Sequence, residues 1–573
     1  MPPPSVDAAG SAVTEQPQQP SRVRTLAPLR VREYRRIWAA ALVSNLGTFL
    51  QLTAAPWLMF ELTGSALLVA SVTTAMTLPR LLLTLPAGAL ADVVDRRTLL
   101  LAGQLISAAA VAAMAVLVAV DLLGPTALLA LSFVLGTGTA IAMPSFQTLV
   151  PELVPRPLMP QAITLNSAAF NVARSVGPAI GGALVAVGLA SAAFGLNAVS
   201  YLAVVAVLLS FPRSKMDDVT RQPLWRSAAT GLRYARFTRP IRVLLGVTAA
   251  FALTTASLQA LLPVVATELG LGGTGFGVLL GAFGAGALVA ALTRERVRTI
   301  AGQWMLPGSM IAFGAMGITV GLATAPVVAG VALVLAGCAW VWTLTTLNAS
   351  VQLLAPRWVR GRVVSLYILA IGLQPIGALL AGVIAEISSA GLTVALFTSL
   401  TAVLGFAALR WRLPVLGDLD EPQAADDWTA QPRHARQVGG TPVMVATTWE
   451  IDLDEVDDFL GVMRELRRQR FRTGAHRWSL FRDADHPQRI TEFFVVHDWS
   501  EHLAQHARID QEAAAVISRA RGYDRDGGPV TRHLAGLEVV GTVAPFAEQL
   551  LTVHEELHRS DGSVPLSSEP PDA

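Results

Sequence analysis

The chain has 573 residues, of which 53% are hydrophobic and only 15% are charged, and its mean hydropathy is +0.52. Soluble proteins have about a quarter charged residues, so this composition excludes an ordinary soluble protein and points to membrane-spanning segments. The net charge of +2 gives no case for nucleic-acid binding. The single cysteine, Cys338, excludes an internal disulfide and a cysteine-based metal site.

Residues 1–30 are predicted to form a disordered tail, because the first 25 are rich in Pro, Ser and Gln and lack the apolar core of a secretory signal. Twelve apolar segments of about twenty residues or more then follow. They are 37–60, 66–91, 98–120, 125–147, 162–187, 190–211, 240–267, 274–293, 302–323, 326–349, 363–386 and 391–411. This pattern predicts an all-α polytopic membrane protein with twelve transmembrane helices. Its two six-helix halves, 31–212 and 240–412, are joined by a basic cytoplasmic linker at 213–239.

The basic residues indicate the orientation of these helices. All but two of the 27 Lys and Arg residues in 1–412 lie in alternate loops or before the first span, and the remaining loops contain none. Positively charged loops stay in the cytoplasm, so both termini are expected there, in a multi-pass protein of the inner membrane. The two exceptions, Arg80 and Arg174, fall inside predicted spans.

The two halves repeat each other weakly. Residues 146–151 (FQTLVP) are echoed by residues 351–356 (VQLLAP) at an offset of 205, and a shift of 203 places Asp92 on Glu295. Internal repeats of this kind are typical of secondary transporters.

A charged motif follows the second span. It consists of Gly88, Leu90, Asp92, Arg96 and Arg97. The motif resembles the signature loop of the major facilitator superfamily, in which the Asp helps to latch the two halves in one conformation. This chain departs from the pattern, because Val93 replaces a basic residue and Asp95 replaces a Gly. The alternative is a solvated turn with flanking charges.

The fifth span has a face of small residues. It comprises Ala173, Gly177, Pro178, Gly181 and Gly182 and resembles the antiporter motif of the same superfamily. Small residues at this spacing let another helix approach closely, which is also the simpler explanation of the pattern. Ser132 stands where the family has an arginine linked to proton transfer, and no predicted span has a carboxylate near its middle. The resemblance implies proton coupling, but these residues leave the energy source open.

Five polar side chains are candidates for a substrate cavity: Arg80, Arg174, Asn171, Asn45 and Gln51. An arginine inside a membrane is costly and usually faces a cavity or a partner, so Arg80 or Arg174 is expected to meet an anionic or carbonyl-bearing substrate. The alternative is that each binds nearby carbonyls or amides, such as that of Asn171.

Residues 30–412 most resemble the branch containing enterobactin exporters and macrolide efflux proteins. The resemblance rests on PSFQTLVPELVPR, NSAAFNVARSVGPAIGG and LTGSALLV. It implies a secondary-active exporter of a siderophore, drug or other small organic molecule that works by alternating access. The alternatives are an importer or uniporter on the same fold. A pump driven by ATP is disfavoured, because no Gly-rich loop ending in Gly-Lys-Ser or Gly-Lys-Thr occurs.

The chain changes character after the last span. A linker at 413–440 precedes a soluble α+β domain at 441–541 and a tail at 542–573. Alternating and helical patterns predict strands at 443–451, 476–482, 490–496 and 530–537, and helices at 453–470 and 500–519.

This domain resembles the ferredoxin-like domains of the antibiotic-biosynthesis monooxygenase group through residues 493–502 (FFVVHDWSEH). The resemblance implies self-association, and a bifunctional transporter with an enzymatic domain is the alternative to a non-catalytic one. His502 and His506 have the spacing of a metal-binding pair on a helix. No second pair at ligand spacing is evident, so the sequence predicts neither a metal nor a cofactor.

Overall fold

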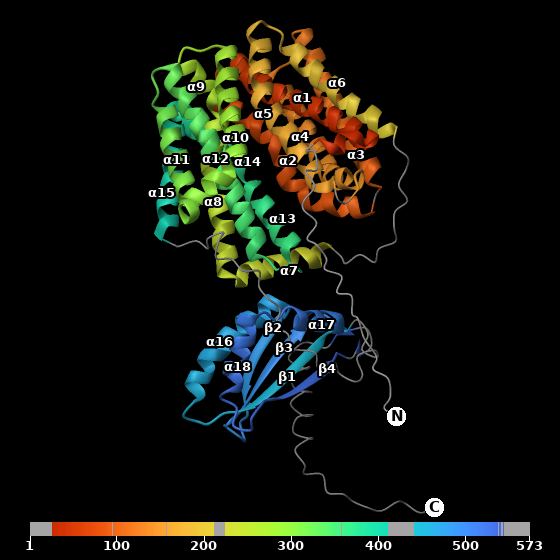
Figure 1. Ribbon diagram of the computed structural model, residues 1–573, viewed down its shortest axis with the longest axis vertical. Coiled ribbons are helices and arrows are strands. Elements are labelled where there is room, and N and C mark those ends of the chain that lie inside the picture. Colours follow the sequence, from red (N-terminus) through yellow and green to blue (C-terminus); the bar gives the residue numbers. More distant parts are fainter. Residues whose placement is uncertain are drawn as a thin grey trace, which may run out of the picture.

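The computed structural model describes residues 26–93, 95–155, 158–210, 224–356, 358–410, 441–536, 538–539 and 542–543. A large helical bundle is followed by a separate α+β unit (Figure 1). The helices of the first half are α1 (Arg32–Thr63), α2 (Ala66–Val93), α3 (Arg96–Ala119), α4 (Pro125–Glu152), α5 (Met159–Ala186) and α6 (Ala190–Leu209). Those of the second half are α8 (Arg239–Ala260), α9 (Leu262–Glu268), α10 (Gly273–Ala301), α11 (Met305–Gly321), α12 (Pro326–Leu354), α13 (Arg360–Ile371), α14 (Gln374–Ile387) and α15 (Ala390–Arg410).

Ten stretches of the described chain are long and apolar enough to cross a membrane. One of them, Gly273–Gly321, contains both α10 and α11, and α5 is not among the ten. The chain is therefore a mostly helical membrane protein with about ten apolar helices.

Two predicted spans are broken in the structure. Segment 240–267 is divided into α8 and α9, and segment 363–386 into α13 and α14. Pro263 and Pro375 lie in the first turn of α9 and of α14, respectively. Proline has no amide hydrogen and disfavours helical geometry in the residue before it, so each break has a local cause.

The structure also contains helices where the sequence predicted a tail and a linker. A short 3-10 helix, η1 (Ala27–Arg30), lies in the predicted tail and precedes α1. A second 3-10 helix, η3 (Gly302–Trp304), begins the predicted span 302–323 and joins α10 to α11. The amphipathic helix α7 (Leu224–Phe237) lies in the basic linker. Tyr234 and Ala235 of α7 belong to the same buried cluster as Ile241 and Leu244 of α8, which explains why this segment folds onto the bundle.

The two halves of the bundle meet closely at the end where α2 begins. A Cβ atom added to Gly277 of α10 would lie only 2.7 Å from the Cα atom of Gly182 and from the carbonyl oxygen of Pro178, both in α5. A Cβ atom on Gly382 of α14 would lie 2.7 Å from the Cβ atom of Ala70 in α2. Small residues thus bring helices of opposite halves into backbone contact.

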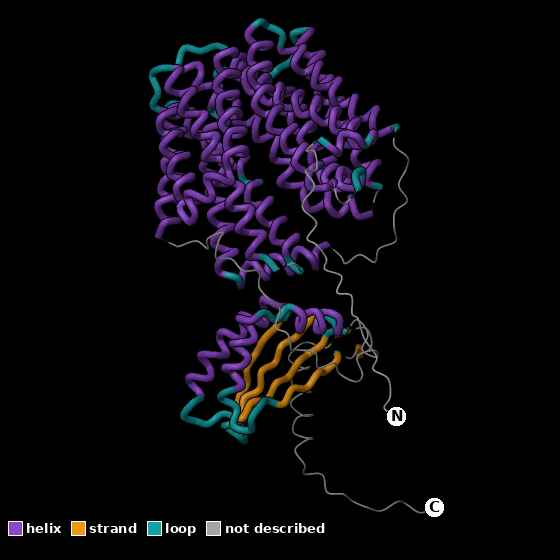
Figure 2. The backbone as a smooth tube through the Cα atoms, viewed as in Figure 1, coloured by secondary structure: helices purple, strands orange, loops and turns teal. Residues whose placement is uncertain are grey.

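The α+β unit consists of a four-stranded antiparallel sheet with helices on one face (Figure 2). Its elements are β1 (Val443–Glu450), α16 (Val456–Thr473), β2 (Arg477–Arg482), β3 (Arg489–Val496), α17 (Trp499–Ala507), α18 (Gln511–Arg521) and β4 (Val530–Ala535), followed by the short pair β5 (Glu538–Val539) and β6 (Thr542–Val543). The strand order β2-β3-β1-β4 and the β-α-β-β-α-β sequence of elements are those of a split βαβ fold. The predicted strands and the first predicted helix are confirmed to within a few residues.

The second predicted helix of this unit, 500–519, is two helices in the structure. The Asp510 carboxylate accepts a hydrogen bond from the Ala513 amide, and so caps the start of α18. A side chain that satisfies free amides at a helix start fixes a new N-terminus there. The core beneath the helices is formed by Trp449, Phe459 and Leu466, each at most 1% exposed.

We expect Gly277→Val to force α5 and α10 apart, because the new side chain would overlap the backbone of α5. Overpacking of this kind costs about 1–3 kcal/mol. Hydrogen–deuterium exchange of peptides from α5 and α10 in lipid nanodiscs should rise. Gly246→Val is the matched control, because a Cβ atom at Gly246 of α8 would have nothing within 4 Å. Equal exchange in the two variants would contradict the close packing of α5 and α10.

Candidate functional site

The middle of the bundle holds an arginine of one half against aromatic rings of the other. The Arg174 guanidinium carbon of α5 lies 4.3 Å from the ring centre of Trp340 in α12 and 5.5 Å from that of Phe283 in α10. Aromatic faces attract cations in a dehydrated setting, so the rings stabilise the charge of Arg174. A guanidinium whose face stacks on a ring still points its N–H groups outward in its own plane, where they can donate hydrogen bonds.

Trp340 brings a second donor to the same place. Its indole nitrogen is buried and has no hydrogen-bond partner among the described residues. Its ring also makes an edge contact with Phe283, with the ring centres 6.1 Å apart. Arg174, Trp340 and Phe283 therefore form a site that combines aromatic faces with hydrogen-bond donors. We call these three residues the Arg174 site.

The sequence did not predict Trp340 or Phe283. The sequence did contain a signal for Trp340. Tryptophan is enriched at the edges of membranes, whereas Trp340 falls near the middle of its apolar segment, which is an unusual place for it. The sequence could not show that α12 and α10 face α5, since these helices are far apart in the chain.

The other predicted cavity residues are distributed over the first half. Gln51 is fully buried, accepts a hydrogen bond from Asn197 at 2.5 Å and points its amide nitrogen at the Met114 sulfur at 3.3 Å. These partners belong to α6 and α3, so Gln51 connects helices of one half. Asn45 is half-buried and Arg80 is exposed on α2. The side chain of Asn171 lies outside the described residues.

The predicted latch motif is described only in part. The surroundings of Gly88 and the side chains of Leu90, Asp92 and Arg96 lie outside what the structure describes. Arg97 donates hydrogen bonds to the carbonyls of Leu208 and Leu209, both at 3.0 Å. A cation at the C-terminal end of α6 satisfies free carbonyls and complements the helix dipole. The neighbouring Asp95 caps α3 by accepting from the Thr98 amide.

The antiporter-like motif packs against two helices. Cβ atoms added at Gly177 and Gly181 would meet α1, at 2.5 Å from the Phe49 Cβ atom and 2.9 Å from the Leu50 carbonyl oxygen. Gly182 faces Gly277 of α10, Ala173 is fully buried, and Pro178 lies inside α5. The motif thus joins α5 to its own half and to the other half.

The Glu386 carboxylate connects the two halves at the end where α2 begins, which we call the closed end. Glu386 of α14 accepts hydrogen bonds from the Ser65 hydroxyl and the Leu67 amide, both at 3.1 Å. These donors lie at the start of α2, where a helix attracts negative charge. Glu268 caps α15 in the same manner through the amides of Ala390 and Gly391, but within a single half.

The α+β unit contacts the bundle through aromatic and charged side chains. Phe237 of α7 stacks on Phe471 of α16 with ring centres 4.9 Å apart. The Arg508 guanidinium carbon lies 4.4 Å from the ring centre of Trp358, in the loop between α12 and α13. Burial lowers the pKa of Arg233 in α7, and the negative charge of Glu501 opposes that shift.

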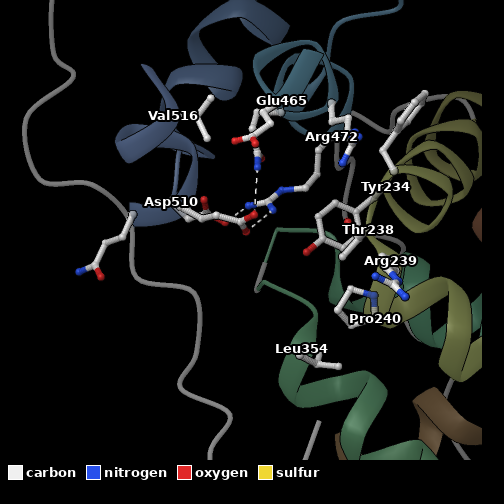
Figure 3. Close-up of a pocket in the computed structure, with 14 residues that line it drawn as sticks. Tyr234, Thr238, Arg239, Pro240, Leu354, Glu465, Arg472, Asp510 and Val516 are labelled. Carbon is white, nitrogen blue, oxygen red and sulfur yellow. Dashed lines mark hydrogen bonds and ion pairs between the residues drawn. The ribbon is translucent and has the colours of Figure 1, made fainter. Parts of the chain in front are cut away.

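A cavity of about 670 Å³ lies beside these contacts (Figure 3). Its lining comes from α7, α8 and α12 on one side and from α16 and α18 on the other. Arg472 reaches Asp510 and Glu512 within this lining, so its charge is balanced by carboxylates of the same unit. The sequence predicted none of these contacts.

Curated relatives match about two thirds of the chain. The multidrug efflux pump Tap of Mycolicibacterium fortuitum is 29% identical over 400 residues, which cover 66% of this chain and 95% of that protein. Tap of Mycobacterium tuberculosis is 30% identical over 416 residues, covering 68% and 94%. The staphyloferrin A transporter of Staphylococcus aureus is 26% identical over 351 residues, covering 60% and 87%. About a third of this chain lies outside these relatives.

Solved transporter structures share the fold. A mutant of the nucleoside transporter NupG superposes with a TM-score of 0.57 at 12% identity, covering 66% of this chain and 99% of that one. A bacterial homologue of the human lysosomal transporter Spinster, inward-facing and unoccupied, gives a TM-score of 0.54 at 15% identity, covering 68% and 97%.

The family comparison covers almost the whole chain. The model described as transmembrane secretion effector matches residues 23–538, which include the α+β unit. The resemblances to enterobactin exporters and to monooxygenases find no support among these matches and stay predictions. The chain belongs to the transmembrane secretion effectors of the major facilitator superfamily.

Proposed function

We propose that this protein is a secondary-active exporter of small organic molecules that works by alternating access. The observation that carries the proposal is the closure of the two halves at one end, through Gly182 on Gly277 and through Glu386 on the start of α2. Alternating access requires two halves that move as rigid bodies and meet through contacts that can separate. The names of Tap and of the staphyloferrin A transporter support export of drug-like or siderophore-like molecules.

The proposal includes twelve membrane spans with both termini in the cytoplasm. Counting α10 and α11 separately and adding α5 to the ten apolar stretches gives this number. The arginine-rich loops support the orientation. The closed end of the bundle then faces away from the cytoplasm, and the protein is in an inward-facing state.

The Arg174 site is the proposed substrate contact. It lies between the halves, where major facilitator proteins bind their substrates. Aromatic faces suit a flat or apolar body, and the donors of Arg174 and Trp340 suit a carbonyl or carboxylate. An amphipathic organic molecule that carries such an acceptor fits this combination.

Glu386 is the proposed proton-sensitive contact between the halves at their outer end. Its carboxylate crosses between the halves, and protonation would remove the negative charge that holds the start of α2. Proton binding from the outer side would thus favour separation of the halves at that end. An importer would use the same contacts. The direction of substrate movement in everted vesicles distinguishes an exporter from an importer.

The α+β unit is proposed to dock on α7 and so to restrain the movement of the halves. Its contacts with Phe237 and Trp358 involve α7 and the loop before α13, and the segment carrying α7 connects the two halves. An enzymatic role is the alternative, tested by whether the full-length protein chemically alters the exported compound.

We expect Arg174→Ala to lower transport more than about tenfold, because the substrate loses its charged donor. Trp340→Phe keeps an aromatic ring and removes the N–H group, so it should mainly weaken substrate binding. A drug and siderophore susceptibility panel of a deletion strain supplies the substrate, and uptake into everted vesicles measures the effect. Arg298→Ala is the control, because Arg298 is exposed and pairs with Glu295. Wild-type transport by both site variants would exclude this site.

Glu386→Gln should abolish the acceleration of uptake by a proton gradient in everted vesicles, since the amide cannot change charge. The matched control is Glu268→Gln, which alters an equivalent helix cap within one half. Acceleration by the gradient that persists in Glu386→Gln at the wild-type level would show that another group responds to the proton.

Trp358→Ala should release the α+β unit, because Arg508 loses the ring on which it stacks. A partly buried cation–π contact contributes about 1–2 kcal/mol, so the ratio of docked to undocked protein should fall about tenfold. Hydrogen–deuterium exchange of α7 and α16 measures this. Trp304→Ala, at an exposed tryptophan of η3, is the control. Unchanged exchange in Trp358→Ala would argue that the docking depends on other contacts.

A further inference from the structure

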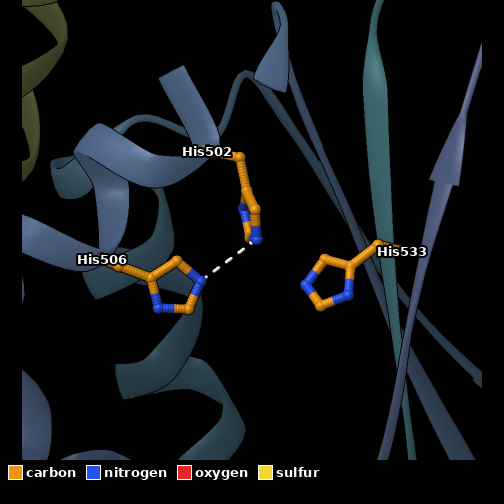
Figure 4. Close-up of side chains that lie close together, drawn as sticks. All are labelled: His502, His506 and His533. Carbon is orange, nitrogen blue, oxygen red and sulfur yellow. Dashed lines mark hydrogen bonds between the residues drawn. The ribbon is translucent and has the colours of Figure 1, made fainter. Parts of the chain in front are cut away.

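Three histidines of the α+β unit point toward one another from two elements (Figure 4). His502 and His506 lie one turn apart on α17, and His533 lies on β4 at the edge of the sheet. One ring nitrogen of each histidine lies within 4.8 Å of the corresponding atoms of the other two. The fold thus supplies a third histidine that the spacing of His502 and His506 does not reveal.

The distances approach those of a bound metal ion. The Nε2 atoms of His502 and His506 are 3.1 Å apart. Two imidazole nitrogens on a tetrahedral Zn²⁺, at about 2.0–2.1 Å from the ion, are separated by about 3.3–3.4 Å. The helical pair therefore already has nearly the required spacing. His533 is exposed, so its side chain has room to move the remaining distance.

The protonation of the histidines suits metal binding. His502 is 2% exposed, and burial together with the charges of its neighbours lowers its pKa to about 3. Burial also lowers the pKa of His506 and of His533. Neutral imidazoles are the form that binds metals, so no proton has to leave these rings at neutral pH.

Trp499 packs against two of the three histidines. The Trp499 ring lies 5.2 Å from the ring of His502 and 5.6 Å from that of His533, measured between ring centres. The nearby cation Arg470 is neutralised by a bidentate contact with Glu492, at 3.0 and 3.2 Å. The buried Gln505 side chain makes a hydrogen bond with His502, so the cluster is bordered by an aromatic ring, an amide and a paired cation.

We propose that His502, His506 and His533 bind one Zn²⁺-like divalent transition-metal ion. Three imidazole ligands suit zinc and its neighbours in the first transition row, and exclude magnesium and calcium, which prefer oxygen ligands. With three protein ligands, a fourth tetrahedral position stays open to water or to a ligand. The ion would tie α17 to β4. The competing explanation is a set of packed neutral histidines joined by the hydrogen bond between His502 and His506.

Zinc binding to the full-length protein tests the site. The protein is purified in detergent without a polyhistidine tag, stripped with a chelator, loaded with Zn²⁺, desalted and analysed for zinc by mass spectrometry. We expect one zinc ion per wild-type chain. His502→Gln, His506→Gln and His533→Gln should each weaken the affinity more than about tenfold, since even loss of a residue that only supports a metal ligand costs that much.

His486→Gln is the matched control, because His486 is exposed in the turn between β2 and β3, away from the cluster. His533→Gln also guards against misfolding as an explanation, because this exposed position is not part of the packed core. Co²⁺ in place of Zn²⁺ should give the visible absorption of a tetrahedral site in the wild type and in His486→Gln, and lose it in the three variants. Equal zinc content in the wild type and in the combined variant of all three positions would overturn the proposal.

Discussion

The close approach of glycine-bearing helices from opposite halves is the constraint on which the bundle depends. Helices in lipid gain little from burying apolar side chains against one another, so association relies on packing and polar contacts. Gly182 and Gly277 allow α5 and α10 to touch through their backbones, and Gly382 lets α14 pack closely on the Ala70 methyl group of α2. Each pair joins one helix of each half, so the two contacts together close one end of the molecule.

This closure determines where the charged groups of the bundle lie. Arg174 is on α5, and the aromatic rings that its guanidinium contacts are on α10 and α12. Glu386 is on α14, and the helix start that it caps belongs to α2. Both interactions cross between the halves, so any separation of the halves changes them.

The α+β unit adds two features on different parts of its surface. The contacts with the bundle come from Phe471 on α16 and from Arg508, just after α17. The histidine cluster lies between α17 and β4. An ion that ties α17 to β4 would hold the segment that carries Arg508. A metal and the bundle would thereby be connected through a single short helix.

The sequence by itself determined the helical membrane architecture, the arginine asymmetry and the strands of the α+β unit. These features depend on composition and on local periodicity, which are written in consecutive residues. It also singled out Arg174 and Gly182 as candidates, since an arginine or a glycine pattern inside an apolar segment stands out. The breaks at Leu261 and Arg508 were missed, because a nearby Pro263 or Asp510 acts on one turn and does not change the average pattern.

Only the tertiary structure decided which residues meet. Trp340 is 166 positions from Arg174, and His533 is 27 positions from His506. Gln51 looked like a cavity residue in its apolar segment, and its contacts with Asn197 and Met114 became visible only once α1, α3 and α6 were packed. Such pairings follow from the way whole helices pack, and a periodicity along one segment contains no information about its neighbour in space.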